Sequence, residues 1–363
     1  MSSRRLARAL EGLLHVAGAT PESKAALRDL SAEDRSAFVR EVRMHGLSGL
    51  VMERLLEAGD GAGWDALIQE LDPGRRRAMA VGLRLQRACR EAMSILEEAG
   101  VQPVAPMKGV ALHACLYGSA GARNATDVDL LIPPDMAPRA HAALVDAGHG
   151  HVIKDPSRPA AMRANYENSY LSPSGVLIDV HVGLAQSERV DLDAAAMLER
   201  AAVDPRLADW GASLVQLDAE DTLLILAVHL AQDAYQGPFR QLVELAWWWE
   251  RRRPDLEVAA ARAERAGAST ALWAGLWLAR ARCGAAVSDA DLAELEPSAL
   301  RRRWLLWLGG DEPVTPIPRW KGSRWIQIAT LYPVMDGFGR RILFTWRYLT
   351  CRVRDWAGLV FDV

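Results

Sequence analysis

Lysine is scarce in this chain of 363 residues. Only four of its 43 basic residues are lysines, and the other 39 are arginines. Lysine carries a compact point charge, whereas the arginine guanidinium is a planar fork that suits paired hydrogen bonds. Each lysine is therefore informative, and the four are Lys24, Lys108, Lys154 and Lys321.

Cysteines and long apolar runs are also few. The four cysteines lie far apart, and no two have the spacing of a metal-binding pair: Cys89, Cys115, Cys283 and Cys351. We therefore expect a reduced, cytoplasmic protein. No apolar run approaches the roughly 20 residues that a membrane span needs, so we expect no span. Arg8, Glu11 and His15 interrupt the apolar positions near the start, which excludes the core of a signal peptide there.

The chain has no strong excess of charge. Its 43 basic and 46 acidic residues give a net charge of −3, too close to neutral for a protein that coats nucleic acid. Any site for a polyanion must therefore be local. Half of the residues are hydrophobic, which is enough for a buried core and two or three packed units.

The spacing of apolar residues predicts helices, then a mixed centre, then helices again. Leucines three and four apart favour helices from Leu6 to Leu56, and Ser31 is typical of a helix cap. Pro73-Gly74 predicts a break before a long helix over 75–99. Strands are expected at 101–106, 127–132, 166–171 and 176–182, with a helix over 137–147. Helices return over 218–235, 239–251 and 256–283. We therefore divide the chain into regions 1–100, 101–200 and 201–363.

Acidic residues alternate with apolar ones in the expected strand at 127–132. Successive side chains of a strand point to opposite faces, so Asp127 and Asp129 share one face while Val128 and Leu130 share the other. Two adjacent carboxylates are costly unless they are neutralised. A divalent cation such as Mg²⁺ prefers carboxylate oxygens and bridges them to substrate phosphates.

A second strand repeats this arrangement. Asp179 and His181 share one face of the expected strand at 176–182. Three strand-borne carboxylates, namely Asp127, Asp129 and Asp179, suit a two-metal site for phosphoryl transfer, in which the ions lie ~3.5–4 Å apart. Asp179 is the candidate to accept the proton of the attacking hydroxyl.

Lys108-Gly109 stands where a strand is expected to pass into a helix. Free backbone N–H groups and the helix dipole favour an anion at such a junction. Gly109 permits close approach of the backbone, and Lys108 adds a positive charge for phosphates. Gly118-Ser119 is a rival phosphate-binding pair, but it follows the helix instead of starting it.

The order of these motifs resembles that in the uncharacterised bacterial nucleotidyltransferases of the polymerase-β-like superfamily. The motifs are, in chain order, Lys108-Gly109, Arg123, Asp127-Val128-Asp129 and Ile178-Asp179-Val180-His181. The resemblance extends from Leu47 to Arg251, and its helical part includes His229 and 240–246. In that family an Asp is more frequent at the position of Glu244.

This resemblance implies an α+β fold, in which a polymerase-β-like core of a small mixed sheet with helices is flanked by N-terminal and C-terminal helical regions. It also implies transfer of a nucleoside monophosphate from an NTP, expected to be ATP, with Mg²⁺ or Mn²⁺. The acceptor would be a small molecule or a peptide, in specialised-metabolite or modified-peptide biosynthesis.

Several residues keep two interpretations. Arg123 contacts the triphosphate or braces its loop, and His181 contacts a phosphate, orients an acid or is structural. His229 and Asp233 are four residues apart on an expected helix; a hydrogen bond is favoured there over a metal pair, because no third ligand is apparent. His113 is expected to be structural.

Tryptophan and arginine dominate the later part of the chain. The triple Trp247-Trp248-Trp249 cannot face one side of a helix, so one ring must be partly exposed or lie in an interface. Residues 301–355 contain eleven basic and four acidic residues interleaved with tryptophans. This tail forms amphipathic helices, the favoured interpretation, or a surface for an acidic peptide, RNA or anionic lipid.

Three functions follow from these features. The first is a magnesium-dependent enzyme that transfers AMP to a hydroxyl or phosphate of a small molecule or peptide. The second is a non-catalytic scaffold that keeps the fold and binds a partner through its tail. The third is a toxin-type nucleotidyltransferase acting on tRNA.

Overall fold

The computed structural model describes residues 3–59, 63–152, 166–184, 189–210, 214–233, 235, 237–309, 335–337, 339 and 341–342. The first half contains α1 (Ser3–Leu13), α2 (Pro21–Arg28), α3 (Ala32–Met44), α4 (Ser48–Glu57), α5 (Asp65–Glu98), β1 (Ala105–Met107), α6 (Lys108–Leu112), a π-helix (His113–Tyr117), β2 (Asp127–Leu131), a 3-10 turn (Pro134–Met136), α7 (Ala137–Asp146) and β3 (Gly150–Val152). The second half contains β4 (Glu167–Leu171), β5 (Leu177–His181), α8 (Ala194–Arg200), a 3-10 turn (Pro205–Trp210), α9 (Ala219–Gln232), α10 (Phe239–Arg252), α11 (Leu256–Ala266), α12 (Ser269–Cys283), α13 (Asp289–Glu294) and α14 (Ala299–Gly309).

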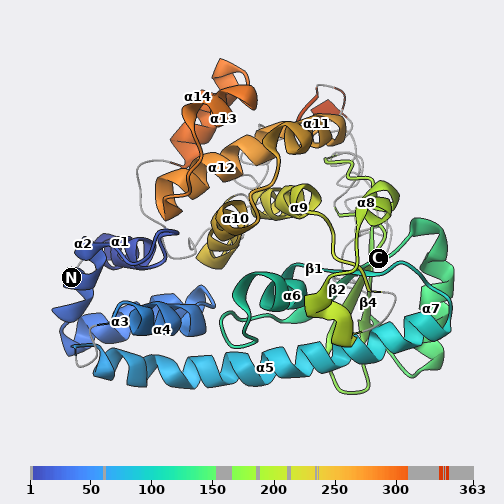
Figure 1. Cartoon of the computed structure of the whole chain (residues 1–363), viewed down its shortest axis with the longest axis horizontal. Helices are drawn as coiled ribbons and strands as arrows, with labels where there is room; N and C mark the ends of the chain where they lie inside the picture. The colour runs from blue at the N-terminus through green and yellow to red at the C-terminus, as the bar shows by residue number, and fades with distance from the viewer. Residues whose placement is uncertain are drawn as a thin grey trace, which may run out of the picture.

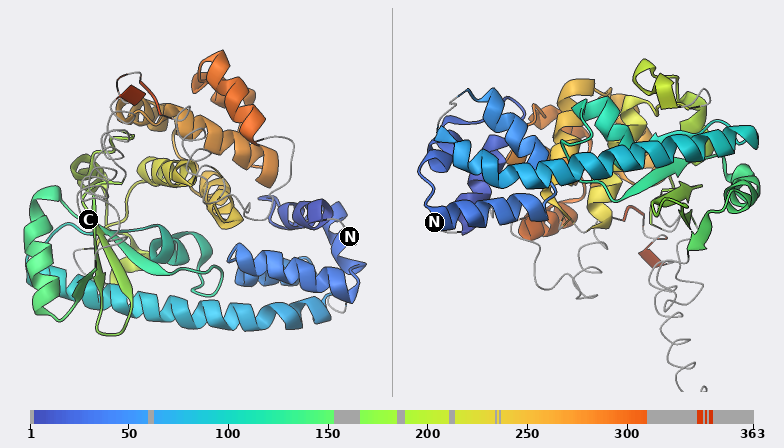
Figure 2. Two further views of the ribbon diagram at one scale, coloured as in Figure 1. Left: turned by 180° about the vertical axis from the view of Figure 1, so that it is seen from behind. Right: turned by 90° about the horizontal axis from the view of Figure 1, so that it is seen from below.

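Helix α5 runs along most of one side of the molecule (Figures 1 and 2). It joins the N-terminal helices α1 to α4 to the region of the sheet and α7 (Figure 1). Within the described residues, no helix combines the length and the apolar character that crossing a bilayer requires.

The break expected at Pro73-Gly74 is wrong, because α5 continues through Pro73 as one helix of 34 residues. Leu67 and Leu71 before the proline and Ala78 after it are buried, so the apolar face of the helix continues across this point. Burial of that face outweighs the local cost of a proline inside a helix.

The basic triplet after Pro73 therefore lies inside the helix and not at its start. Arg75 and Arg76 both pair with Asp72, which lies three and four residues earlier on the same helix.

The sheet has five strands in the order β1-β2-β5-β4-β3. β2 and β5 are parallel, and the other neighbouring pairs are antiparallel. The strands expected at 127–132, 166–171 and 176–182 are confirmed to within about two residues at each end, whereas β3 was not anticipated. The small mixed sheet with flanking helices confirms the expected α+β fold class.

The first strand differs from its expected position. It covers only Ala105–Met107, and Val104 instead makes an isolated bridge with Leu214. Pro106, which we expected to end the strand, lies in its middle. β1 is an edge strand of this sheet. An edge strand tolerates proline because its outward-facing N–H groups make no hydrogen bonds to another strand, so a missing N–H there costs no ladder hydrogen bond.

The C-terminal helices α9, α10 and α12 pack against one another. Trp247 and Trp248 are buried and Trp249 is half-buried, so the expectation that the three rings cannot share one environment is confirmed. The run 256–283 divides into α11 and α12 at Gly267, which has a left-handed backbone (φ +70°). Most of the 301–355 tail lies outside the described residues.

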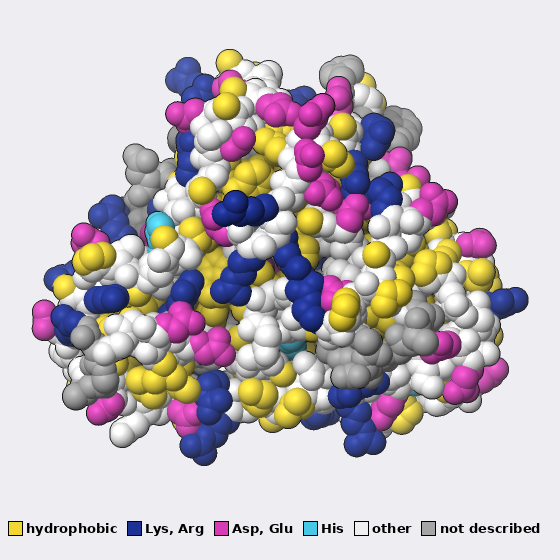
Figure 3. Space-filling view, in the orientation of Figure 1, with side chains coloured by type: hydrophobic (Ala, Val, Ile, Leu, Met, Phe, Trp, Pro, Cys, Tyr) yellow, Lys and Arg dark blue, Asp and Glu magenta, His cyan; other side chains and the backbone are white. Residues whose placement is uncertain are grey.

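Arginines from the C-terminal half tie that half to the core. Arg251 donates to the carbonyl oxygen of Leu116 at 2.6 Å, and Arg206 donates to that of Cys115 at 3.2 Å. These carbonyl groups end the π-helix and have no partner within it, so the two guanidinium groups satisfy them. Lys and Arg side chains also gather near the centre of the face drawn in Figure 3.

Candidate active site

The parallel pairing of β2 with β5 brings together two acidic strands that are distant in sequence. Asp129 lies directly opposite Asp179 in the register of the two strands. The side chains are nearly buried, with 8% of Asp129, 2% of Asp179 and 2% of His181 exposed, whereas Asp127 is half-buried. The two strands therefore place carboxylates side by side in a largely dehydrated environment.

Three side chains form a possible metal site. Asp129, Asp179 and His181 each offer one ligand atom, and these atoms all lie within 4.8 Å of one another. The metal set expected from the sequence was Asp127, Asp129 and Asp179, so the two sets share Asp129 and Asp179. Asp127 lies outside the compact group, but it is close enough to interact electrostatically with both other aspartates.

His181 is held by groups on either side of its ring. Its Nε2 lies 2.8 Å from Oδ1 of Asp129, and its Nδ1 lies 3.8 Å from Oε2 of Glu167. The ring of Tyr166 stacks over it with a centroid distance of 6.4 Å. His181 is therefore positioned to orient Asp129 or to bind a cation with it.

The charges in this cluster depend on one another. Burial alone would raise the pKa of Asp129, but the Lys108 ammonium and the hydrogen bond from His181 outweigh burial and hold that pKa well below its usual range. Burial, together with repulsion from Asp129 and Asp179, raises the pKa of Asp127. Asp129 is therefore firmly ionised, whereas the ionised form of Asp127 would be stabilised by an added cation.

Lys108 lies at the strand-to-helix junction that the sequence predicts, between β1 and α6. Its Nζ is 3.7 Å from Oδ1 of Asp129, so the side chain reaches back over the acids. Burial opposes the charged form of Lys108, but Asp129 and Glu167 outweigh it and raise the pKa. The backbone φ of +45° is uncommon for a residue with a side chain. Such local strain is frequent at functional sites.

Gly109 borders a narrow gap. A Cβ at this position would meet the Cβ of Ala125 at 3.5 Å and the carbonyl oxygen of Asp127 at 3.6 Å, which is ordinary contact. A side chain would therefore fill the space between α6 and the start of β2. Because α6 has only five residues, a helix dipole contributes little here, and Lys108 supplies the main positive charge at this junction.

Comparison with protein families identifies the chain. Residues 31–284, about 70% of its length, match the model of a family described as uncharacterised nucleotidyltransferase. The chain belongs to this nucleotidyltransferase family. The resemblance inferred from the sequence is confirmed, as is the expectation of an enzyme of nucleotidyl transfer. No curated protein matches the chain.

Arg123 of this nucleotidyltransferase makes a buried ion pair. Its Nε lies 3.0 Å from Oε1 of Glu244 on α10, and both side chains are almost fully buried. The same Nε donates to the carbonyl oxygen of Asn124 at 3.1 Å. These contacts fit the bracing interpretation of Arg123. Its Nη1 still borders the gap, 3.6 Å from the place of a Cβ on Gly109, so contact with a phosphate stays a prediction.

The sequence alone did not assign Arg240 a role. It lies in the first turn of α10, where burial and the charge of Arg123 lower its pKa while Glu244 and Asp127 oppose that change. Among the described residues it has no ion-pair partner, although it lies close enough to Asp127 to interact with it. Its position depends on how α10 packs, which no local pattern reveals.

The expected hydrogen bonding at His229 and Asp233 is present through a third residue. The Gln241 amide nitrogen lies 2.9 Å from Nε2 of His229 and donates to Oδ2 of Asp233 at 2.8 Å. Neither residue belongs to the group of possible metal ligands in the described part of the chain. Burial and the Lys108 charge lower the pKa of His229 to about 4, so this side chain is neutral near pH 7.

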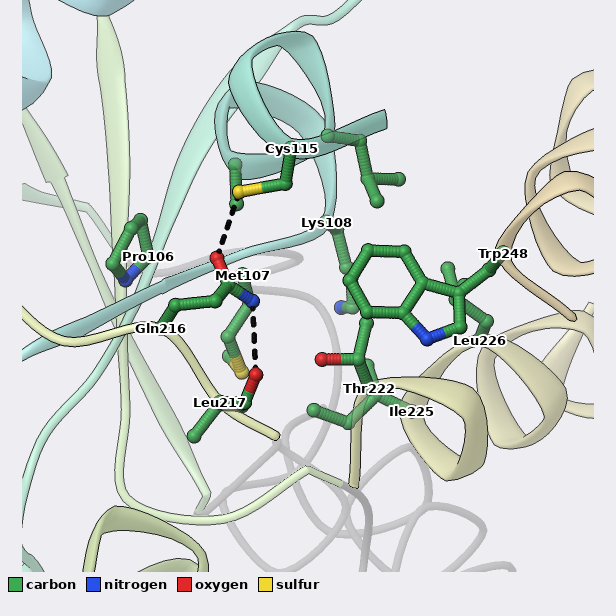
Figure 4. Close-up of a pocket in the computed structure, with 12 residues that line it drawn as sticks. Pro106, Met107, Lys108, Cys115, Gln216, Leu217, Thr222, Ile225, Leu226 and Trp248 are labelled. Atoms are coloured by element: carbon green, nitrogen blue, oxygen red, sulfur yellow. Dashed lines mark hydrogen bonds between the residues drawn. The ribbon is translucent and has the colours of Figure 1, made fainter. Parts of the chain in front are cut away.

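The small cavity beside Lys108 is not the nucleotide site. Figure 4 shows that this cavity is enclosed by three parts of the chain: α6, the segment around Gln216, and helix α9. Thr222 of α9 and Trp248 of α10 line the side opposite Gln216. Its volume is about 10 Å³, room for about one water molecule. This cavity is therefore too small for a nucleotide.

Proposed function

We propose that this enzyme transfers a nucleoside monophosphate, expected to be AMP, from an NTP to a hydroxyl or phosphate of a small molecule or peptide. The observation that carries the proposal is the register of β2 and β5, which sets Asp129 against Asp179 with His181 and Lys108 beside them. The expected setting is the biosynthesis of specialised metabolites or modified peptides.

The donor set fits a divalent cation. Two carboxylates and an imidazole within 4.8 Å offer the oxygen ligands that Mg²⁺ and Mn²⁺ prefer, and a nitrogen that Mn²⁺ accepts more readily. Asp129, Asp179 and His181 would hold one ion, and Asp127 with Asp129 would share a second. When bound, such ions neutralise the triphosphate and acidify an attacking hydroxyl.

The residues of the chain have distinct tasks in the proposed reaction. The acceptor oxygen forms a bond to the α-phosphorus while the bond from that phosphorus to the bridging oxygen breaks, and pyrophosphate leaves. Asp179 accepts the proton of an attacking hydroxyl. Lys108, whose Nζ lies 3.7 Å from Oδ1 of Asp129, would stabilise the negative charge that develops on the leaving pyrophosphate. Gly109, which has no side chain, lets the backbone at the start of α6 approach the phosphates.

The test is incubation of the protein with each labelled NTP and a cell extract, followed by separation of labelled products by size. We expect a labelled small molecule or peptide with ATP. Asp127→Ala, Asp129→Ala and Asp179→Asn should remain folded and lose at least about 100-fold in turnover. Asp146→Asn, an exposed acid on α7, is the matched control and should keep full activity.

Two results would contradict the proposal. Full activity in Asp129→Ala would remove the acid cluster from the mechanism. Label that disappears after nuclease treatment would show RNA as the acceptor, which is the toxin-type alternative. Membership of a nucleotidyltransferase family already favours an enzyme over the scaffold alternative.

A further inference from the structure

A groove with a volume of about 620 Å³ borders the segment that leads into Asp127. Asn124, Ala125 and Thr126 form one wall, and Arg77 and Gly74 of α5 lie on the other. Its volume is within the range of small-molecule sites, about 300–1,000 Å³. The groove is therefore large enough for a substrate, unlike the cavity beside Lys108.

The groove adjoins the acidic cluster through two of its wall residues. Thr126 lines the groove and directly precedes Asp127 in the chain. Ala125 lies 3.5 Å from the place of a Cβ on Gly109. The same short segment thus separates the groove from the proposed phosphate gap, and a molecule in the groove would lie next to the reacting groups.

The charge of the groove is positive. Arg43 of α3 and Arg77 of α5 line it, both are exposed, and none of its described lining residues is acidic. Arg43 uses one N–H group on the carbonyl oxygen of Glu70 at 2.7 Å, and its other donors remain for a ligand. Arg77 has no ion-pair partner among the described residues. Guanidinium groups bind phosphate oxygens through paired charge-assisted hydrogen bonds.

We infer that this groove binds the acceptor, a small molecule with a phosphate monoester held by Arg43 and Arg77. The inference rests on the proposed function, in which Lys108 and cations at the acids already neutralise the phosphates of the NTP. Because the NTP phosphates are assigned to the acids and Lys108, the second positive site remains for a different anion, and two guanidinium groups suit a phosphate dianion. Thr126 lines the groove directly before Asp127, so the reactive oxygen of the same acceptor would lie towards the acids.

The first experiment measures binding of inorganic phosphate by ³¹P NMR in buffer with EDTA, so that no divalent cation contributes. The wild-type protein should bind phosphate, and the double variant Arg43→Ala/Arg77→Ala should bind it at least about tenfold more weakly. Lys108→Ala should retain binding. So should Arg90→Ala, an exposed arginine of α5 outside the groove. Loss of binding in Lys108→Ala with retention in the double variant would overturn the inference.

The second experiment uses nucleotidyl transfer to an extract. Arg77→Glu should raise the half-saturating amount of acceptor at least about tenfold without changing KM for the NTP, whereas Arg90→Glu should change neither. Phosphatase treatment of the extract should abolish labelling. A raised KM for the NTP would assign the groove to the nucleotide, and labelling that survives phosphatase would exclude a phosphate monoester. If no transfer is detected at all, the phosphate titration still decides whether the groove binds phosphate.

Discussion

At the scale of single residues, the Lys108 ammonium and a hydrogen bond with His181 stabilise the ionised form of Asp129. Lys108 lies 3.7 Å from Asp129, and the pKa of Asp129 is held low by this ammonium together with His181. The same carboxylate is a candidate metal ligand, so a cation and Lys108 compete for it. Lys108 therefore offsets the negative charge of Asp129, and we propose that it contacts the phosphates of the NTP.

Arg240 should contribute to nucleotide binding. It is a half-buried guanidinium close to Asp127 with no ion-pair partner in the described chain, and such a cation is costly unless an anion joins it. We predict that Arg240→Gln raises KM for the NTP about tenfold with little change in Tm. Arg253→Gln, at the other end of α10, is the control. An unchanged KM in Arg240→Gln would exclude contact with the triphosphate.

His113 should make the fold sensitive to acid. Burial and the charge of Arg123 lower its pKa to about 4, from about 6.5 in the unfolded chain. Between these values the unfolded state binds a proton that the folded state does not. Stability is therefore present above pH 6.5 and is lost as the pH falls towards 4, by up to about 3 kcal/mol from this residue.

The measurement is urea unfolding at pH 7 and pH 5. His113→Gln should lose less stability between these pH values than the wild type does. His229, whose pKa is also lowered to about 4, should account for part of the remaining loss, and His229→Gln tests that separately. If the loss in His113→Gln equals that of the wild type, His113 does not titrate as described.

At the scale of elements, N-terminal helices hold the loop that precedes β2. The N–H of Leu50 in α4 donates to the carbonyl oxygen of Ala122 at 2.8 Å, and the N–H of Asn124 donates to that of Gly46 at 3.0 Å. A Cβ on Gly49 would lie 1.8 Å from the carbonyl oxygen of Gly121, so α4 and the loop meet backbone to backbone. The position of Asp127 thus depends on helices far away in sequence.

Gly49→Ala should therefore be strongly destabilising. The added methyl group meets backbone that cannot move without shifting α4 or the loop, and we expect a loss of about 3 kcal/mol or more in the free energy of unfolding. Gly150→Ala is the matched control, since a Cβ there meets only one atom, at 4.0 Å. Equal stability of the two variants in thermal unfolding would contradict the close approach.

At the scale of the whole molecule, the expected regions 1–100, 101–200 and 201–363 are in close contact. α5 contacts β2 and α7, and α10 packs on the π-helix of the core. The ion pair of Arg123 with Glu244 joins the loop before β2 to α10. We still propose these three regions as divisions of the sequence. The candidate site depends on all of them, because α4 holds the loop before β2, the core provides the acids, and α10 provides Glu244.

Breaking that ion pair should weaken the whole fold. Glu244→Gln leaves the Arg123 charge buried without its counter-ion, which costs about 3–5 kcal/mol. Glu244→Asp, the residue more frequent in the resembling family, keeps the charge and should cost less. Chemical denaturation measures both. A loss below about 1 kcal/mol in Glu244→Gln would show that the pair does not tie α10 to the core.

The sequence by itself determined the local features of this protein. Alternation of apolar and acidic residues fixed the strands that contain Asp129 and Asp179, because a strand has a period of two whatever surrounds it. It also placed Lys108-Gly109 at a strand-to-helix junction. Together with Arg123, these residues carry the resemblance to a nucleotidyltransferase family.

Only the tertiary structure decided what meets at the site. The parallel register of β2 and β5 set Asp129 opposite Asp179, and the packing of α10 brought Arg240 and Glu244 to the same region. Helix α5 continues through Pro73 because its apolar face is buried, although proline locally disfavours a helix. These outcomes depend on contacts between residues far apart in the chain, and the free energy of such contacts is not encoded in any local pattern.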